Sequence, residues 1–226
     1  MSEAILDVQG LVTEIRTRRG VVRAVDDVSL TVGRGEIVAL VGESGSGKSM
    51  TAYSLMQLFP TPAARIAAGQ IRFEGRDLLT TPPDELRRIR GDRMAMIFQD
   101  PSSFLNPLMT VGRQVAEPLL ARDYPRNQID ARVHDLLTRM GLPDAASLAR
   151  RYPFELSGGQ RQRALIAAAL ACKPMLVIAD EPTTALDVTV QAQIMDLLHS
   201  LRDELGLSIL LITHDLGIVA QHADRV

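Results

Sequence analysis

Residues 42–49 carry a complete G-x-x-x-x-G-K-S sequence, Gly42-Glu43-Ser44-Gly45-Ser46-Gly47-Lys48-Ser49. A nearly continuous apolar run, Glu36–Val41, precedes this sequence, and Met50–Phe59 follows at helical spacing until Pro60. A glycine loop between a strand and a helix can hold phosphate, because its backbone N–H groups and the positive end of the helix dipole face the anion. The sequence therefore predicts a phosphate-binding loop from Gly42 through Met50.

The strands around this loop indicate an α/β fold. Apolar runs at Met94–Phe98, Met175–Asp180 and Ser208–Thr213 are typical of buried strands, and the amphipathic Val190–Leu205 between the last two predicts a β-α-β crossover. The first forty residues are predicted to form strands joined by turns. We predict a P-loop NTPase fold with a RecA-like parallel core, an N-terminal antiparallel β region and a helical insert.

Prolines and helical patterns mark the insert. Six prolines divide the stretch after Asp100 into short pieces, and Val111–Leu120 and Ala131–Met140 show helical spacing. We predict that residues 1–99 and 161–226 form the core and residues 100–160 the insert. Asp215–Ala223 is predicted to be helical, and Arg225-Val226 to open a further strand. Because a sheet protein rarely stops there, we expect a missing C-terminal part.

Composition excludes several classes of protein. A formal net charge of -2 argues against a dedicated nucleic-acid binder, so no nucleic acid is expected as a partner. The single cysteine, Cys172, excludes an internal disulfide and is expected to be a small core residue. Apolar runs such as Ala164–Cys172 are too short for the ~20 residues that span a bilayer. We expect a cytoplasmic protein that reaches any membrane through a partner.

Acidic residues end a predicted central strand. Asp180 and Glu181 follow Met175–Ala179, at the carboxyl end of a strand, where ligands bind in open parallel sheets. Lys48 is expected to reach the β- and γ-phosphates of ATP, and the Ser49 hydroxyl and Asp180 to hold Mg²⁺. Glu181 is expected to polarise the attacking water. The alternative, an exposed acidic turn before Pro182, is disfavoured beside a complete phosphate loop.

Two further polar residues follow strands that end at the same edge. Gln99 follows Met94–Phe98, and His214 follows Ser208–Thr213. A lone histidine or glutamine is usually structural, and only convergence at one edge makes them candidates. We expect His214 to contact the γ-phosphate, and Gln99 to contact Mg²⁺ or the lytic water.

A second glycine-containing segment precedes a predicted helix. It is Leu156-Ser157-Gly158-Gly159-Gln160, ahead of Arg161–Ala171. Ser157 suits a helix N-cap, and the small residues leave N–H groups open to an anion. Spacing alone does not separate a simple cap from a second phosphate cradle.

The order of these motifs resembles the ATPase subunit of an ABC transporter, over essentially the whole chain. In that family the Ser-Gly-Gly-Gln segment of one subunit completes the ATP site of the other. The resemblance implies that Ser157, Gly158, Gly159 and Gln160 act in trans, and that Ala185-Leu186-Asp187 lines the dimer interface. A second ATPase subunit is therefore an expected partner, and whether it is identical stays open.

A finer resemblance is to the ATPases of peptide and nickel importers. Four segments of this chain are similar to segments of those proteins: Phe98–Pro107, Gly112–Pro118, Arg87–Gly91 and Arg18–Val25. This resemblance implies that the chain powers ATP-driven uptake through two transmembrane permease subunits and lies against them at the cytoplasmic face of the membrane. An extracytoplasmic solute-binding protein is then an indirect partner. Asp100–Pro118 is the expected permease contact. The solute stays open among peptide, glutathione, opine and nickel.

One position departs from the family pattern. Many ABC ATPases stack adenine on an aromatic residue where this chain has Arg23. A guanidinium can also stack on a base, and a surface charge is the alternative.

The sequence supports three other functions less well than an importer ATPase. They are an exporter or lipid-handling ATPase, a soluble ABC ATPase of DNA repair or translation, and a nucleotide-binding scaffold without turnover.

Overall fold

The computed structural model describes residues 4–184 and 186–226. Within them the strands form two sheets. The antiparallel sheet has the order β2-β1-β4-β5 and comprises β1 (Ala4–Thr17), β2 (Gly20–Gly33), β4 (Ala64–Phe73) and β5 (Arg76–Asp77). The parallel sheet has the order β3-β8-β7-β6 and comprises β3 (Ile37–Val41), β6 (Met94–Ile97), β7 (Leu176–Asp180) and β8 (Ser208–Thr213). The predicted α/β fold with an N-terminal antiparallel region and a helical insert is confirmed.

The parallel sheet is the centre of the molecule, and every residue of β7 and β8 is buried. Alternate residues of a strand face opposite sides. Val177 and Leu211 pack with the helices of the insert, whereas Ile178 and Leu210 pack with β1, β4 and α1 (Lys48–Met56). The sheet therefore separates two apolar cores, which explains why its strands read as continuous apolar runs.

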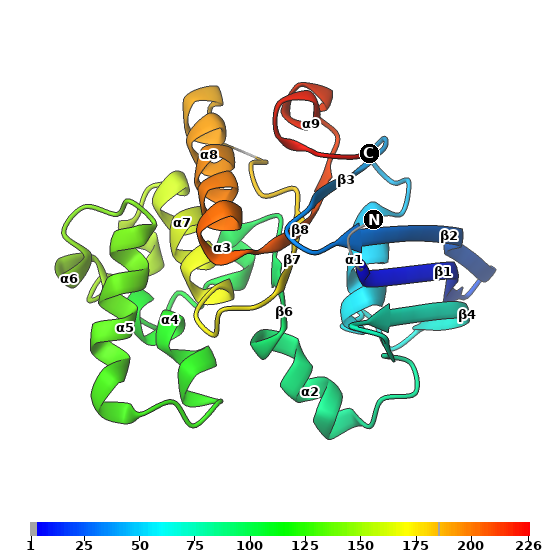
Figure 1. Cartoon of the computed structure of the whole chain (residues 1–226), viewed down its shortest axis with the longest axis horizontal. Helices are drawn as coiled ribbons and strands as arrows, with labels where there is room; N and C mark the ends of the chain where they lie inside the picture. Colours follow the sequence, from blue (N-terminus) through cyan, green and yellow to red (C-terminus); the bar gives the residue numbers. More distant parts are fainter. Residues whose placement is uncertain (1–3, 185) are drawn as a thin grey trace.

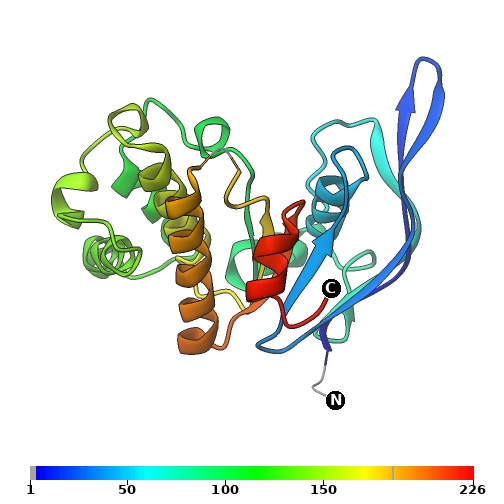
Figure 2. The same ribbon diagram turned by 90° about the horizontal axis from the view of Figure 1, so that it is seen from above.

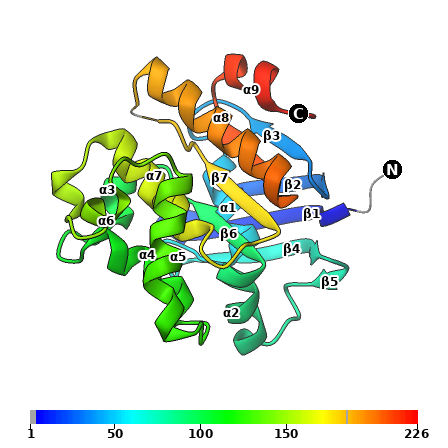
Figure 3. The same cartoon turned by 60° about the vertical axis from the view of Figure 1, so that its left-hand side comes forward.

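Residues 100–157, all of which the structure describes, contain helices as their only regular elements. They are α3 (Pro101–Phe104), α4 (Val111–Leu120), α5 (Arg126–Arg139), α6 (Ala145–Leu148) and a 3-10 turn (Pro153–Glu155). Of these, α4, α5 and α6 group at one end of the molecule, opposite the antiparallel sheet (Figure 1), and stay together in the other views (Figures 2 and 3).

The remaining helices flank the parallel sheet. They are α2 (Pro83–Asp92), α7 (Gly158–Ala169), α8 (Val188–Leu205) and α9 (Leu216–His222). Among the described residues, no helix combines the length and the apolar character needed to cross a bilayer. After α9, Arg225 forms an isolated parallel bridge with Val38, and the strand predicted to open at Arg225-Val226 is limited to this bridge.

Two expectations about helix ends are wrong. The first helix starts at Lys48 and stops at Met56, well before Pro60, because Gln57 adopts a left-handed conformation with a φ of 48°. Pro118 does not break the chain but lies inside α4. Proline has no N–H to donate to the carbonyl four residues back, so α4 continues through Pro118 with one backbone hydrogen bond fewer. Pro101 and Pro153, in contrast, begin helical segments, as proline's fixed φ favours.

Candidate functional site

The glycine loop is held tightly against the antiparallel sheet. Gly47 lies immediately before α1 with a φ of 94°, a left-handed conformation that favours glycine. A Cβ at Gly47 would lie 2.2 Å from the carbonyl oxygen of Ala24 in β2. The loop can therefore close on this strand only with glycine at position 47, which places β2 beside the start of α1.

Lys48 lies across the loop. Its side chain is largely buried, and its Nζ donates hydrogen bonds of 2.8 Å to the carbonyl oxygens of Gly42 and Glu43. The ammonium group is thus fixed beside the backbone N–H groups of the loop and the N-terminus of α1. A cation and N–H donors gathered at one point suit a phosphate group.

Asp180 and Ser49 form a pair of oxygen donors beside the loop. The Ser49 hydroxyl donates to Asp180 Oδ1 at 3.1 Å, and Asp180 is only 2% exposed. Burial raises the pKa of the Asp180 carboxyl, the nearby Glu181 raises it further, and Ser49 and Lys48 oppose the shift. A buried carboxylate is stabilised by a cation, and Mg²⁺ prefers such oxygen ligands. These two side chains therefore fit a magnesium ion.

Glu181 is surrounded by three polar side chains. Gln99 Nε2 donates to Glu181 Oε2 at 2.9 Å, the Thr184 hydroxyl donates to the same oxygen at 2.8 Å, and His214 Nδ1 lies 3.4 Å from Oε1. The fold thus brings Gln99, Glu181 and His214 together, as the sequence predicts. Thr184 was not predicted, because nothing in the local sequence indicates its contact with Glu181.

The backbone of Glu181 is also unusual. Its φ of 46° places it in the left-handed region, which non-glycine residues adopt rarely. Its N–H donates to the carbonyl oxygen of Ile212 in β8 at 2.8 Å, which fixes this conformation. Backbone strain of this kind is concentrated at functional sites, where the surrounding structure enforces it.

Two adjoining cavities follow the loop. One, of about 480 Å³, is lined by Ser44–Met50, Val22–Ala24, Gln99 and Glu181. The other, of about 560 Å³, is lined by Val41–Ser44, Gln99, Glu181, His214 and Leu216. The two cavities share Ser44, Gln99 and Glu181. Between them they are lined by every predicted loop residue and by Arg23 and His214. Val22 and Ala24 line the first cavity as well, and they were not predicted.

Arg23 lies at the wall of the first cavity, with its guanidinium fixed by carboxylates. Its Nη1 is 3.2 Å from Asp26 Oδ1, and its Nε is 3.9 Å from Glu14 Oε1. The Arg23 side chain is 60% exposed. This arrangement permits stacking on a base, which stays a prediction.

Ser157 caps α7. Its hydroxyl accepts from the Gln160 N–H at 3.3 Å, and Gln160 Oε1 accepts from the Ser157 N–H at 3.0 Å. This reciprocal pair is a capping box, and helix geometry leaves the N–H groups of Gly158 and Gly159 without intrahelical partners. Residues 157–160 line neither cavity at the loop. They therefore do not complete the loop's own site in the single chain. Ala185 of the predicted dimer segment lies outside the described residues.

Comparison with known proteins decides the family. Residues 25–184 match the family model described as ABC transporter. The chain belongs to the ABC transporter family. It is an ABC-type ATPase, and the resemblance drawn from the order of its motifs is confirmed.

Solved ABC cassettes share its fold. The dimeric structure of the ATP-binding cassette MJ0796 in a post-hydrolysis state, bound to ADP and Pi, is 30% identical with a TM-score of 0.84. The match covers 97% of this chain and 91% of that one. The CbiO1 cassette of Clostridium perfringens, part of an ABC transporter complex, is 28% identical with a TM-score of 0.82, over 99% and 83% of the two chains.

Sequence relatives are more similar than these structures. A Brucella ovis protein named "Putative peptide import ATP-binding protein" is 51% identical over 99% of this ABC ATPase and 68% of the relative. A Brucella abortus protein of the same description is 51% identical over 98% of this chain and 67% of the relative. The sequence match therefore extends over nearly all of this cassette.

Proposed function

We propose that this ABC ATPase is the ATP-hydrolysing subunit of a peptide importer. ATP hydrolysis is supported by one observation: the phosphate loop and the Glu181 carboxylate line the same cavity. Beside it, Ser49 bonds to the buried Asp180, and Gln99 bonds to Glu181. A role in peptide import is supported by relatives that are 51% identical and are described as peptide import ATP-binding proteins. The transported peptide is not specified by the ATPase subunit.

Each site residue has a role in this proposal. The backbone of Gly42–Ser49 and the Lys48 ammonium hold the phosphates of ATP, and Met50 lies at the end of this cradle. Mg²⁺, held by Ser49, Asp180 and Gln99, would supply charge neutralisation on the phosphate oxygens. Glu181 orients and polarises the attacking water, and His214 contacts the γ-phosphate. Catalysis is positioning and electrostatic stabilisation rather than covalent chemistry.

The second cradle acts across a dimer in this proposal. Ser157, Gly158, Gly159 and Gln160 would bind the nucleotide held by the loop of the other ATPase subunit. The N-terminus of α7 supports this role, because Ser157 and Gly158 are exposed and their helix presents N–H groups. The other subunit is either a copy of this chain or a similar ATPase, and the proposed role of the segment in trans is the same in both cases.

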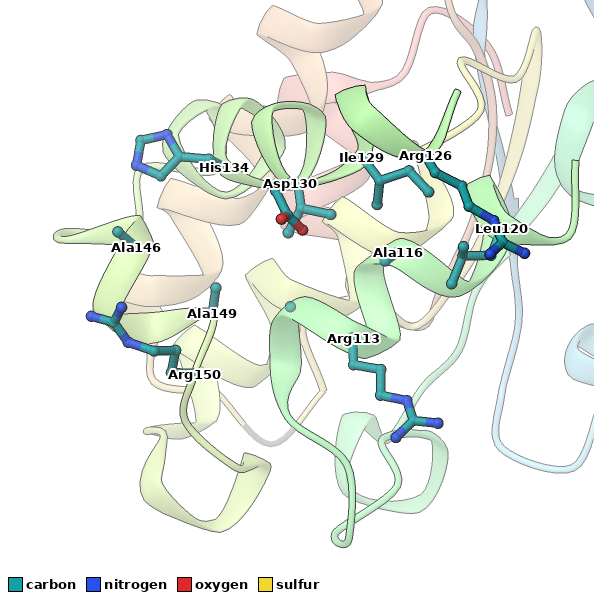
Figure 4. Close-up of a pocket in the computed structure, with 12 residues that line it drawn as sticks. Arg113, Ala116, Leu120, Arg126, Ile129, Asp130, His134, Ala146, Ala149 and Arg150 are labelled. Carbon is teal, nitrogen blue, oxygen red and sulfur yellow. The ribbon is translucent and has the colours of Figure 1, made fainter. Parts of the chain in front are cut away.

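The insert offers a surface for the permease subunits. In Asp100–Pro118, the apolar side chains of Leu108 and Phe104 are 85% and 44% exposed. The end of the same segment borders a cavity of about 690 Å³ between α4, α5 and α6 (Figure 4). Gly112, Arg113 and Ala116 line it. We place the contact with two transmembrane subunits here, at the cytoplasmic face, with an extracytoplasmic binding protein delivering the solute.

Changing Arg23 tests how the base is held. We expect Arg23→Ala to weaken ATP and GTP binding alike, by about 2–10-fold, because an exposed stacking contact contributes modestly. Arg23→Tyr is expected to restore affinity through its aromatic ring. Nucleotide titrations measure both, with Arg72→Ala as a control at an exposed position of the same sheet. If neither Arg23 variant alters affinity, the residue is only a surface charge.

Changing Ser157 tests the second cradle. We expect Ser157→Arg to keep ATP binding within about 2-fold and to reduce turnover at least ~100-fold, because a bulky cation blocks the cradle that acts on the partner's nucleotide. Loss of the cap costs about 1 kcal/mol, so thermal unfolding is measured in parallel. Normal turnover by a folded Ser157→Arg protein would remove this segment from the catalytic site.

A further inference from the structure

We propose that Thr184 is a positioning residue that orients the Glu181 carboxylate for hydrolysis. The inference deepens the proposed function and rests on it, since it takes Glu181 as the residue that polarises water. It starts from the 2.8 Å hydrogen bond that the Thr184 hydroxyl donates to Glu181 Oε2.

The bond lies within a turn that holds both residues rigidly. The Thr184 N–H donates to the Glu181 carbonyl oxygen at 3.1 Å, so the backbone closes over Pro182 and Thr183. Two further hydrogen bonds hold this turn. The Glu181 N–H donates to the carbonyl oxygen of Ile212, and Gln191 Nε2 donates to the carbonyl oxygen of Thr183 at 3.2 Å. The hydroxyl is therefore fixed relative to the carboxylate by the turn itself, and the bonds to Ile212 and Gln191 anchor that turn to β8 and α8.

The other two partners of Glu181 differ in this respect. Gln99 follows β6 and His214 follows β8, and the His214 side chain is 61% exposed. In the proposed function Gln99 contacts Mg²⁺ and His214 contacts the γ-phosphate, so both have a second partner. Thr184 has no such role. The hydrogen bond from the Thr184 hydroxyl can therefore hold the Glu181 carboxylate while Gln99 contacts Mg²⁺ and His214 contacts the γ-phosphate.

The expected consequence is a defect in turnover without a defect in binding. Thr184→Val removes the hydroxyl and keeps nearly the same shape. We expect its kcat to fall about 10–100-fold, because a small misplacement of a catalytic group costs up to ~10²-fold in rate. The KM and Kd for ATP should stay within about 2-fold. Thr184→Ser, which keeps the hydroxyl, is expected to retain most of the activity.

A double-mutant cycle separates positioning from a general structural effect. In a Glu181→Ala background, adding Thr184→Val should cause no further loss, because the residue that it positions is gone. A structural defect would instead lower the residual rate again. Thr183→Val is the matched control, since the Thr183 contact to Gln191 uses the backbone carbonyl. Thr184→Ala serves if the valine variant unfolds.

The outcomes distinguish this inference from the proposed function. A wild-type kcat in folded Thr184→Val or Thr184→Ala, beside an inactive Glu181→Gln, overturns the role of Thr184 and leaves Glu181 in place. Additive loss in the Glu181→Ala background overturns it as well. Wild-type turnover by Glu181→Gln would instead remove the proposed function on which it rests.

Discussion

Glu181→Gln is expected to slow ATP hydrolysis by ~10²–10⁴-fold while ATP still binds. The amide keeps the size of the side chain, but it cannot act as a carboxylate base toward water. Lys48, Ser49 and Asp180 lie on other parts of the site, so the contacts proposed for the phosphates and for Mg²⁺ are retained. ATP that binds without being hydrolysed should hold two subunits together.

Steady-state phosphate release measures the rate, and size-exclusion chromatography with light scattering measures nucleotide-dependent dimers. Glu204→Gln, which makes the same chemical change at the exposed end of α8, is the control and should behave as wild type. Turnover at the wild-type rate in Glu181→Gln would show that Glu181 is not the base. His214, 3.4 Å from the Glu181 carboxylate, would then become the residue to test.

Lys48→Ala is expected to weaken ATP binding by about 10–100-fold, since hydrogen bonds to charged groups contribute about 1.5–3 kcal/mol. The loop would lose its side-chain cation, and the carbonyl oxygens of Gly42 and Glu43 would lose the donor that they share.

The sequence offers a matched control, because Lys173 is its only other lysine. Lys173 is exposed after α7 and lines neither cavity at the loop. Direct titration with a fluorescent ATP analogue should show the loss for Lys48→Ala and no change for Lys173→Ala. Equal affinity in wild type and Lys48→Ala would contradict the assignment of the loop.

Features that depend on local pattern could be predicted from the sequence. The glycine loop between a strand and a helix is one, and the polar residues that end β6, β7 and β8 are another. Parallel strands place their carboxyl ends at one edge. Gln99, Glu181 and His214 could therefore be grouped without a structure, although their contacts could not.

Features set by tertiary contacts could not be predicted. The strands β1 and β2 run far beyond the short alternating segments at Ile5–Val8 and Ala24–Leu30, because pairing along the sheet extends them through several register shifts. The left-handed residues Gln57 and Glu181 carry side chains that give no local signal for that conformation. Thr184 became visible as a partner of Glu181 only through the closed turn.

The central claim is that each ATP site is shared between two subunits, and mixing two inactive variants tests it most directly. Lys48→Ala keeps its Ser157–Gln160 segment intact, and Ser157→Arg keeps its loop intact. A mixed dimer would therefore contain one complete site. For a symmetric dimer, equal mixing should recover roughly a quarter of the wild-type rate, because half of the dimers pair unlike subunits and each has one of two sites. If Glu181→Gln subunits associate with ATP but no mixing ratio restores hydrolysis, the shared site is contradicted.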